Sequence, residues 1–192
     1  MRRHVGPVQR LATAALAFGI VLGACAEQTP PSPVSSLVEV AQRASDVQGA
    51  FQLTFELPRT TYRAGEAIEG QATLGVVGGS AVAFGSSGGG PFVFDVAEVG
   101  GLRRVGGAMT ADCAPYRLEP GRPMVSAIIK SGGYSADDPE AAFAQAFLDG
   151  NPVVSLPAGD WRITARASLV EGEGCSGASR SLAAPIVIHV VP

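Results

Sequence analysis

Histidine, lysine and cysteine are scarce in this chain of 192 residues. Two histidines, three cysteines and a single lysine, Lys130, leave few ligands for a zinc or copper site and few candidates for a catalytic base. Only His189 lies in the C-terminal half, and no G-x-S-x-G nucleophile motif accompanies it. Its place between Val187 and Val191 predicts an outward-facing residue of a strand. An enzyme is therefore not expected.

Long apolar runs are also absent. Residues 11–24 form an uncharged apolar run of 14 residues, whereas a membrane-spanning helix needs about 20. Three arginines precede the run and small residues end it. A basic start, a short apolar run and small residues are typical of a secretory signal peptide, which we expect over residues 1–25. Twin-arginine export through Arg2-Arg3 is an alternative, but the residues after this pair fit that signal poorly.

The end of the apolar run carries a specific motif. Leu22-Gly23-Ala24-Cys25 resembles the lipobox of bacterial lipoproteins, in which an aliphatic residue and two small residues precede a cysteine. This resemblance implies cleavage before Cys25, lipid on its sulfur, and a fatty-acyl chain such as palmitate on the new amino end. Several acyl chains anchor durably where one binds marginally. The membrane is thus an expected partner, and the expected location is the bacterial cell envelope, facing the periplasm or the exterior. The alternative is an ordinary secretory signal that happens to end on a cysteine.

The remainder of the chain is acidic and has no run of basic residues. Without residues 1–25 it has 11 basic and 17 acidic residues, a net charge of −6. Nucleic-acid binding needs clustered Lys and Arg, so it is not expected here. The prolines and serines of AEQTPPSPVSS predict a flexible tether over residues 26–49, with a capping box for a short helix over Leu37–Ala44. One domain is expected over residues 50–192.

If Cys25 carries lipid, as the resemblance implies, two cysteines remain. Cys113 and Cys175 are an even pair in an exported protein, where disulfides persist. A bridge would close a loop of about 62 residues and stabilise the fold by about 4 kcal/mol on the chain-entropy model. The alternative is two free buried thiols. A bridged pair would leave no usual ligand set for zinc or copper, and neither a metal nor a cofactor is expected.

Alternation of apolar and polar residues dominates the chain after Ala50. It is strict in FQLTFEL (51–57) and WRITARASL (161–169), and it is typical of half-buried strands. Strands are expected over residues 51–57, 68–76, 81–84, 92–96, 125–129, 161–169 and 186–190. Glycine and proline occupy the gaps. About seven short strands predict an all-β sandwich of two antiparallel sheets.

One segment departs from this period. In ADDPEAAFAQAFLDGNP, Asp138 would cap a helix with Pro139 at its first position and Gly150 after its end. Phe143 and Phe147 would share one face of this helix. We expect a short helical insertion in an inter-strand connection, packed over an open end of the sandwich.

Three motifs occur in the order of a known fold. YRAGEAI (62–68) resembles the Y-x-x-G-[ED]-x-[IV] opening of many bacterial immunoglobulin-like domains, and LEPG (118–121) and LPAGDWRI (156–163) follow it. Together they resemble the immunoglobulin-like sandwich of the bacterial intracellular proteinase inhibitors and related envelope domains. The resemblance implies the fold but no particular activity, because this sandwich carries many. The helical insertion, the glycine-rich loop, the cysteine pair and the export signal depart from the inhibitors, so no inhibitory residues are carried over.

Two polar segments have alternative interpretations as ligand sites. Asp137, Asp138 and Glu140 offer oxygen ligands for calcium, but helix capping explains them more simply. GSSGGGP (85–91) suggests an anion-binding loop, but no Gly-Lys-Ser/Thr follows. A flexible hairpin or inter-sheet loop is expected there.

Two pairs of like-charged residues are further candidates for a functional site. Glu171 and Glu173 are spaced like paired carboxylates of a glycosidase, but they have glycine neighbours and no aromatic sugar platform, which favours a solvated loop. Arg103-Arg104 is expected to be a surface pair.

These observations predict a lipid-anchored envelope module that binds a protein or plays a structural part, without a catalytic site. One candidate surface is the loop Ser86–Pro91. The other is the helical insertion with the Cys175 loop, where Tyr134, Phe143 or Phe147 would contact a partner unless they pack into the core. The alternatives are a protease inhibitor on the same fold and an enzyme of unrecognised type.

Overall fold

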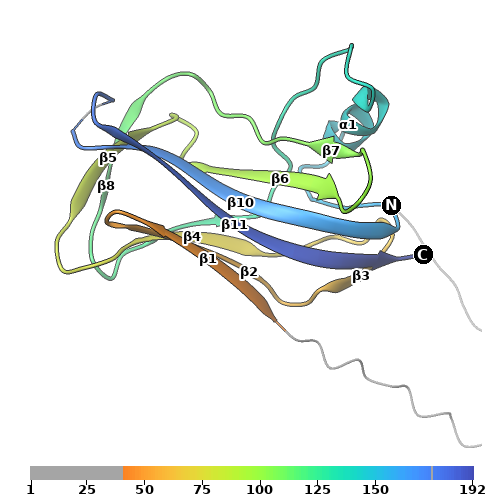
Figure 1. Ribbon diagram of the computed structural model, residues 1–192, viewed down its shortest axis with the longest axis horizontal. Coiled ribbons are helices and arrows are strands. Elements are labelled where there is room, and N and C mark those ends of the chain that lie inside the picture. The colour runs from red at the N-terminus through yellow and green to blue at the C-terminus, as the bar shows by residue number, and fades with distance from the viewer. Residues whose placement is uncertain (1–40, 174) are drawn as a thin grey trace, which may run out of the picture. The chain divides into compact units, whose positions relative to one another are not determined.

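The computed structural model describes residues 41–173 and 175–192, all of which belong to the compact unit Leu37–Pro192. These residues form eleven strands and one helix (Figure 1). The strands are β1 (Gln42–Gln48), β2 (Phe51–Leu57), β3 (Thr61–Arg63), β4 (Gln71–Val76), β5 (Val82–Ser86), β6 (Phe92–Glu98), β7 (Arg104–Val105), β8 (Ala114–Leu118), β9 (Met124–Ala127), β10 (Gly159–Glu171) and β11 (Ala178–Val191). The helix α1 spans Ala141–Leu148. The predicted leader, the lipid site Cys25 and the tether up to residue 40 lie outside the described residues.

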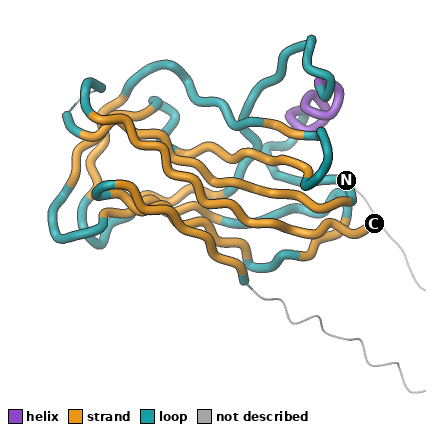
Figure 2. The backbone as a smooth tube through the Cα atoms, viewed as in Figure 1, coloured by secondary structure: helices purple, strands orange, loops and turns teal. Residues whose placement is uncertain are grey.

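The strands form two facing sheets, which confirms the predicted all-β sandwich with one short helix (Figure 2). One sheet has the order β1-β2-β4-β9 and is antiparallel throughout. The other has the order β3-β11-β10-β5-β8, and β6 joins it by pairing with β10 and with β7. β3 runs parallel to β11, so this second sheet is mixed rather than purely antiparallel. In the part of the chain that the structure describes, no helix is long and apolar enough to cross a membrane.

The alternating strands bury one face between the sheets. Phe51 and Phe55 of β2, and Trp161 and Ile163 of β10, are fully buried, as their period of two predicts. Aromatic pairs connect the two sheets: Phe51 lies 5.6 Å from Phe84 and Phe55 lies 5.9 Å from Phe94 between ring centroids. Such contacts of large apolar side chains across the two layers hold a sandwich together.

Strand β1 corrects the predicted tether and helix. Residues 42–48 pair with β2 in antiparallel register, from Gln42 with Leu57 to Gln48 with Phe51. The helix predicted over Leu37–Ala44 is therefore wrong at residues 42–44, and the domain already includes Gln42 rather than starting at Ala50. β1 is an edge strand whose only core contact among apolar residues is the partly buried Ala44. It therefore shows no alternation that a sequence pattern could reveal.

Short edge strands account for the other differences from the predicted seven. β3 and β7 have only three and two residues, too few for a pattern to identify them, and β8 contains Pro115, which weakens a strand pattern. Conversely, β10 and β11 extend to 13 and 14 residues because they pair with each other along nearly their whole length. This long hairpin is the centre of the larger sheet.

Candidate functional site

The loop Ser86–Pro91 is neither a hairpin nor an inter-sheet connection, which corrects the prediction. Both β5 and β6 pair with β10 in antiparallel register: Gly85 opposes Val170, and Phe92 opposes Ala167. The two strands therefore continue one another along one edge of β10. Residues 87–91 leave this line and return to it, and we call them the edge excursion. A glycine-rich stretch suits such a local departure from a strand.

Polar side chains hold the edge excursion in place. Asp112 accepts hydrogen bonds from the Gly88 N–H (3.1 Å) and from the Thr110 hydroxyl. Thr110 Oγ1 lies 2.6 Å from Ser87 Oγ, and the Tyr116 hydroxyl donates to the Ser87 carbonyl (2.7 Å). Ser87 is buried, with 7% of its surface exposed. The excursion is thus fixed to residues 110–116 rather than free to move.

This arrangement disfavours the anion-binding alternative. Asp112 accepts the Gly88 N–H, while Ser87 accepts the N–H groups of Gly89 and Gly90 through its side chain (3.3 Å) and carbonyl (2.9 Å). The hydrogen bonds from Thr110 and Gly88 hold the pKa of Asp112 below its usual range. The loop therefore presents a carboxylate, and its N–H donors are already used.

The helical insertion starts two residues later than predicted. Asp138 accepts hydrogen bonds from the N–H groups of Glu140 (Oδ1, 3.0 Å) and Ala141 (carbonyl, 2.9 Å), so it closes a turn before α1. The N-cap is Glu140, without a side-chain cap, and Asp138 and Pro139 do not hold the predicted cap and first positions. The helix ends at Leu148, and Gly150 follows in the left-handed conformation (φ 74°), as expected.

The acidic residues of the insertion do not converge on a metal site. The carboxylate of Asp138 is used in its own turn, while the charge of Glu140 acts on Arg103. Within residues 41–173 and 175–192, no group of three or more His, Cys, Asp or Glu side chains is placed to hold a metal ion. Asp138 thus closes a turn and Glu140 acts on Arg103, and neither caps the helix through its side chain as predicted.

Arg103 is part of an aromatic stack rather than of a surface pair. Its guanidinium lies 4.9 Å from the ring centroid of Trp161 and 5.8 Å from that of Phe143, and these two rings stack at 5.4 Å. Its Nε donates to Glu98 Oε2 (2.9 Å), and its Nη2 donates to Oε1. The hydrogen bond lowers the pKa of Glu98 and raises that of Arg103. Only Arg104 is exposed, so the predicted surface pair is wrong for Arg103.

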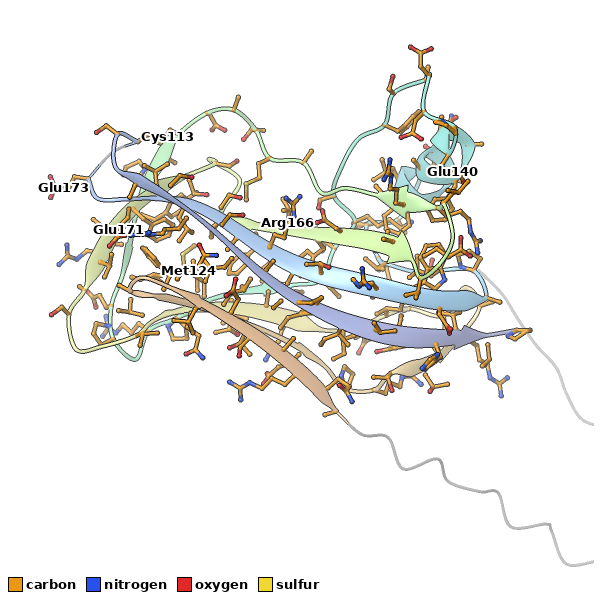
Figure 3. All side chains as sticks on the ribbon, in the orientation of Figure 1. Cys113, Met124, Glu140, Arg166, Glu171 and Glu173 are labelled. Carbon is orange, nitrogen blue, oxygen red and sulfur yellow. A yellow bond between two sulfur atoms is a disulfide. The ribbon has the colours of Figure 1, made fainter. Side chains whose placement is uncertain are left out.

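An apolar hollow lies beside α1, on the helical insertion, whereas the Cys175 loop that the prediction joined to this surface lies with Cys113 at the other end of the sandwich (Figure 3). It has a volume of about 440 Å³ and is lined by Ala64, Gly65, Phe143, Ala146, Phe147 and residues 155–157. We call it the insertion hollow. Phe147 is buried (6% exposed) while Phe143 is partly buried, and Ala146 is exposed at the rim. Of the three aromatic residues predicted as contacts, Phe147 therefore belongs to the core, and Tyr134 is 45% exposed.

A second hollow, of about 760 Å³, was not predicted. It lies on the outer side of the smaller sheet, where Arg43, Glu56, Gln71 and Ala127 of β1, β2, β4 and β9 line its floor. Arg43 and Glu56 form an exposed ion pair (3.4 Å). The sequence could not indicate this surface. β1 has no alternation of apolar and polar residues, and the periodicity of a strand does not show which strands become its neighbours.

The remaining predicted residues have structural surroundings. His189 is exposed, as predicted, and its Nδ1 lies 2.6 Å from Asp160 Oδ1. Glu171 forms an ion pair with Arg180 (2.7 Å), while Glu173 is exposed at the β10–β11 turn (Figure 3). The two glutamates therefore do not face one another as a catalytic pair.

The cysteine pair is bridged, as predicted. Cys113 and Cys175 form a disulfide with their Cα atoms 6.3 Å apart, within the span that a bridge requires. Both residues are exposed, so they are not the buried free thiols of the alternative. Comparison with known proteins adds no assignment: neither a protein-family model nor a curated protein matches this chain.

Proposed function

We propose that this chain is a lipid-anchored module of the bacterial cell envelope, with an immunoglobulin-like sandwich that binds an envelope protein. One observation carries the proposal. The Cys113–Cys175 disulfide uses two of the three cysteines and leaves Cys25, at the end of the lipobox-like motif, as the single remaining thiol. Structural disulfides are a property of exported proteins, and a lone cysteine after a leader is the position that lipid attachment needs.

The surroundings of the reactive side chains favour binding over catalysis. Asp112 holds the edge excursion, Glu98 is paired with Arg103, and His189 of β11 contacts Asp160 on the neighbouring strand β10. Each of these groups has a structural partner. Asp112 does lie beside the hydroxyl of Thr110, which contacts that of Ser87, but these contacts hold the edge excursion. His189 does not converge with them because it pairs with Asp160. Catalysis by acid–base or nucleophilic chemistry would require such convergence.

We place the partner contact at the insertion hollow. Its volume of about 440 Å³ falls within the range of ligand pockets, about 300–1,000 Å³, and two phenylalanines line it. Interface hot spots are pockets of this kind, into which a partner inserts an apolar side chain. The partner is an envelope protein that contributes an aliphatic or aromatic residue to this hollow.

Anchoring is tested by fatty-acid labelling and fractionation. The Cys25→Ser variant should lose label and either leave the membrane fraction or keep its leader. The matched control is the Cys113→Ser/Cys175→Ser double variant, which should keep label and membrane retention. Normal processing and retention of Cys25→Ser would contradict the lipoprotein proposal.

Binding is tested with a photo-crosslinking residue placed at single positions in cells. At Ala146, on the rim of the insertion hollow, it should capture one dominant envelope protein. The control position is Arg122, an exposed turn residue on another part of the sandwich, where that product should be absent. The same product from both positions, or none at Ala146, would exclude the hollow as the contact.

A second candidate function, protease inhibition, is favoured by one loop. Residues 98–103 form a tight turn closed by the Glu98 N–H to Arg103 carbonyl bond (2.8 Å), and Leu102 at its tip is 76% exposed. Arg103 anchors this turn on Trp161. A braced loop that presents one leucine is the form that a substrate-like inhibitor takes. Inhibition of leucine-selective proteases that disappears in Leu102→Asp would establish it, and no inhibition at micromolar concentration would exclude it.

A further inference from the structure

The disulfide lies at the surface and joins the turn of a long paired hairpin to a segment that contains no strand. Cys113 and Cys175 are both exposed, with Cys113 at one end of the sandwich (Figure 3). Cys175 lies in the turn of the β10–β11 hairpin, which is paired from Gly159 with Val190 to Glu171 with Ala178. Cys113 instead ends residues 106–113, which contain no strand and which we call the latch segment. Exposed disulfides are the ones that reductants reach in the folded protein.

The latch segment has few other attachments. At its start, Asp95 Oδ1 accepts the Gly107 N–H (2.6 Å), and Arg166 Nη2 donates to the Gly107 carbonyl (3.2 Å). Arg166 Nε also lies 2.6 Å from Asp95 Oδ2, although its N–H does not point at an acceptor. Further along, Thr110 and Asp112 contact the edge excursion. Beyond Gly107 the segment is thus held by the exposed contacts of Asp112, by the partly buried Thr110–Ser87 contact and by the disulfide.

Polar, solvent-exposed contacts open at low free energy, whereas long paired strands open only with the whole fold. Loss of the disulfide should therefore affect the latch segment selectively. The edge excursion would follow in part, because Asp112 and Thr110 hold it while Tyr116 of β8 keeps its hydrogen bond to the Ser87 carbonyl. The sandwich core does not involve these residues.

A small hollow lies under the latch segment. It has a volume of about 260 Å³ and lies between residues 109–113 with Cys175 on one side and Ser86, Ser87 and residues 168–170 of β10 on the other. Ser86 Oγ donates to the Ser168 carbonyl (2.7 Å), and the Pro91 carbonyl accepts the Ser168 N–H (3.3 Å). Opening the latch segment would expose this part of β10.

We propose that the Cys113–Cys175 disulfide is a redox-controlled latch, whose reduction releases residues 108–113 and loosens the edge excursion while the sandwich stays folded. The reductant is a dithiol protein of the thioredoxin class. Its thiolate attacks one sulfur of the bridge and forms a mixed disulfide, and its second thiol then displaces the cysteine. Two electrons and two protons reach the chain, which ends with two thiols, and the reductant ends as a disulfide. This proposal does not depend on lipidation at Cys25 or on the insertion hollow.

Hydrogen exchange on the purified full chain in detergent tests the proposal. Without denaturant, a thioredoxin-class dithiol should convert Cys113 and Cys175 to free thiols, measured by alkylation and mass. Exchange should then rise at least tenfold at residues 108–113 and 87–90, and stay unchanged at residues 161–167 and 182–190. Resistance to reduction unless denaturant is present would overturn the proposal.

The Cys113→Ser/Cys175→Ser double variant gives an independent measurement. It should show the fast exchange of the reduced chain at residues 108–113 and 87–90, and it should not respond to the reductant. Faster exchange over all of β10 and β11 in the reduced chain would show that the disulfide stabilises the whole domain, and would overturn the proposed latch. No change at residues 108–113 after reduction would overturn it equally.

Discussion

The side-chain amide of Gln48 forms two hydrogen bonds with the backbone of Ser181. Its Nε2 donates to the Ser181 carbonyl (2.6 Å), and its Oε1 accepts the Ser181 N–H (3.2 Å). Asp46 Oδ2 accepts the Ala183 N–H (2.9 Å) in the same way. β1 and β11 belong to different sheets, so these side chains close one side of the sandwich. Pro185, next along β11, has no N–H, so this edge offers few free donors to another strand.

Gln48→Ala should therefore destabilise the sandwich modestly and open this edge. We expect the free energy of unfolding to fall by about 1 kcal/mol, since the two lost hydrogen bonds are exposed and water replaces them. Urea denaturation measures the change. Light scattering should also reveal more self-association, because the edge of β11 is uncovered.

Gln42→Ala is the matched control for this prediction, since Gln42 lies in the same strand with an exposed side chain. It should leave both measurements unchanged. If the two variants changed the free energy of unfolding and the light scattering equally, the Gln48–Ser181 contact would not be the cause of the effect.

The core strands of this fold could be predicted because their pattern and their burial have one cause. In β10, Trp161, Ile163 and Ala165 are buried since alternate residues face the other sheet. β1 lacked that signal because side-chain and backbone hydrogen bonds, rather than apolar burial, hold it to β2 and β11.

The functional surfaces were harder to predict than the core. The disulfide followed from a count of cysteines, and the insertion from a change of period. The edge excursion and the position of Arg103 depend on which strands become neighbours across long stretches of sequence. Arg103 lies on Trp161 only because β6 pairs with β10, and no local pattern contains that pairing.

Arg103→Lys should disturb the stack beside α1 although the charge is kept. Lysine cannot give the two-point contact with Glu98 or stack as a flat guanidinium on Trp161. We expect a loss of about 1 kcal/mol in the free energy of unfolding. Trp161 is the single tryptophan, so its fluorescence spectrum reports the change directly. Arg104→Lys, at the exposed neighbour, should alter neither quantity.

Stability should decrease on acidification because three carboxyl groups have lowered pKa values in the folded chain. Glu66 is hydrogen-bonded by the Arg63 N–H and the Arg59 side chain, Glu98 by Arg103, and Asp112 by Thr110. A lowered pKa means that the unfolded chain binds protons first as pH falls. The stabilisation is complete above the ordinary carboxyl pKa of about 4 and is lost below it, as pH approaches the folded values.

Melting temperature against pH measures this effect. It should be level from about pH 7 to 5 and fall below about pH 4.5. Glu98→Gln should melt lower than the unmodified chain at neutral pH and show a shallower fall in acid, since one of the three groups no longer titrates. Glu119→Gln, in an exposed turn, is the control and should reproduce the unmodified profile. A profile that Glu98→Gln leaves unaltered would exclude the Glu98 contribution.

The two phenylalanines of the insertion should differ in their contribution to stability. Phe147 is buried and its ring also receives Lys130 Nζ at 5.3 Å, whereas Phe143 is partly buried on Trp161. Phe147→Ala should cost about 3–4 kcal/mol in the free energy of unfolding, because it leaves a cavity between α1 and the sandwich. Phe143→Ala should cost less than half of that, since solvent fills the space at the rim of the insertion hollow. Phe147→Leu, which keeps most of the volume, should recover most of the loss in urea denaturation. Equal losses for the two alanine variants would mean that α1 is fixed by stacking on Trp161 rather than by burial of Phe147.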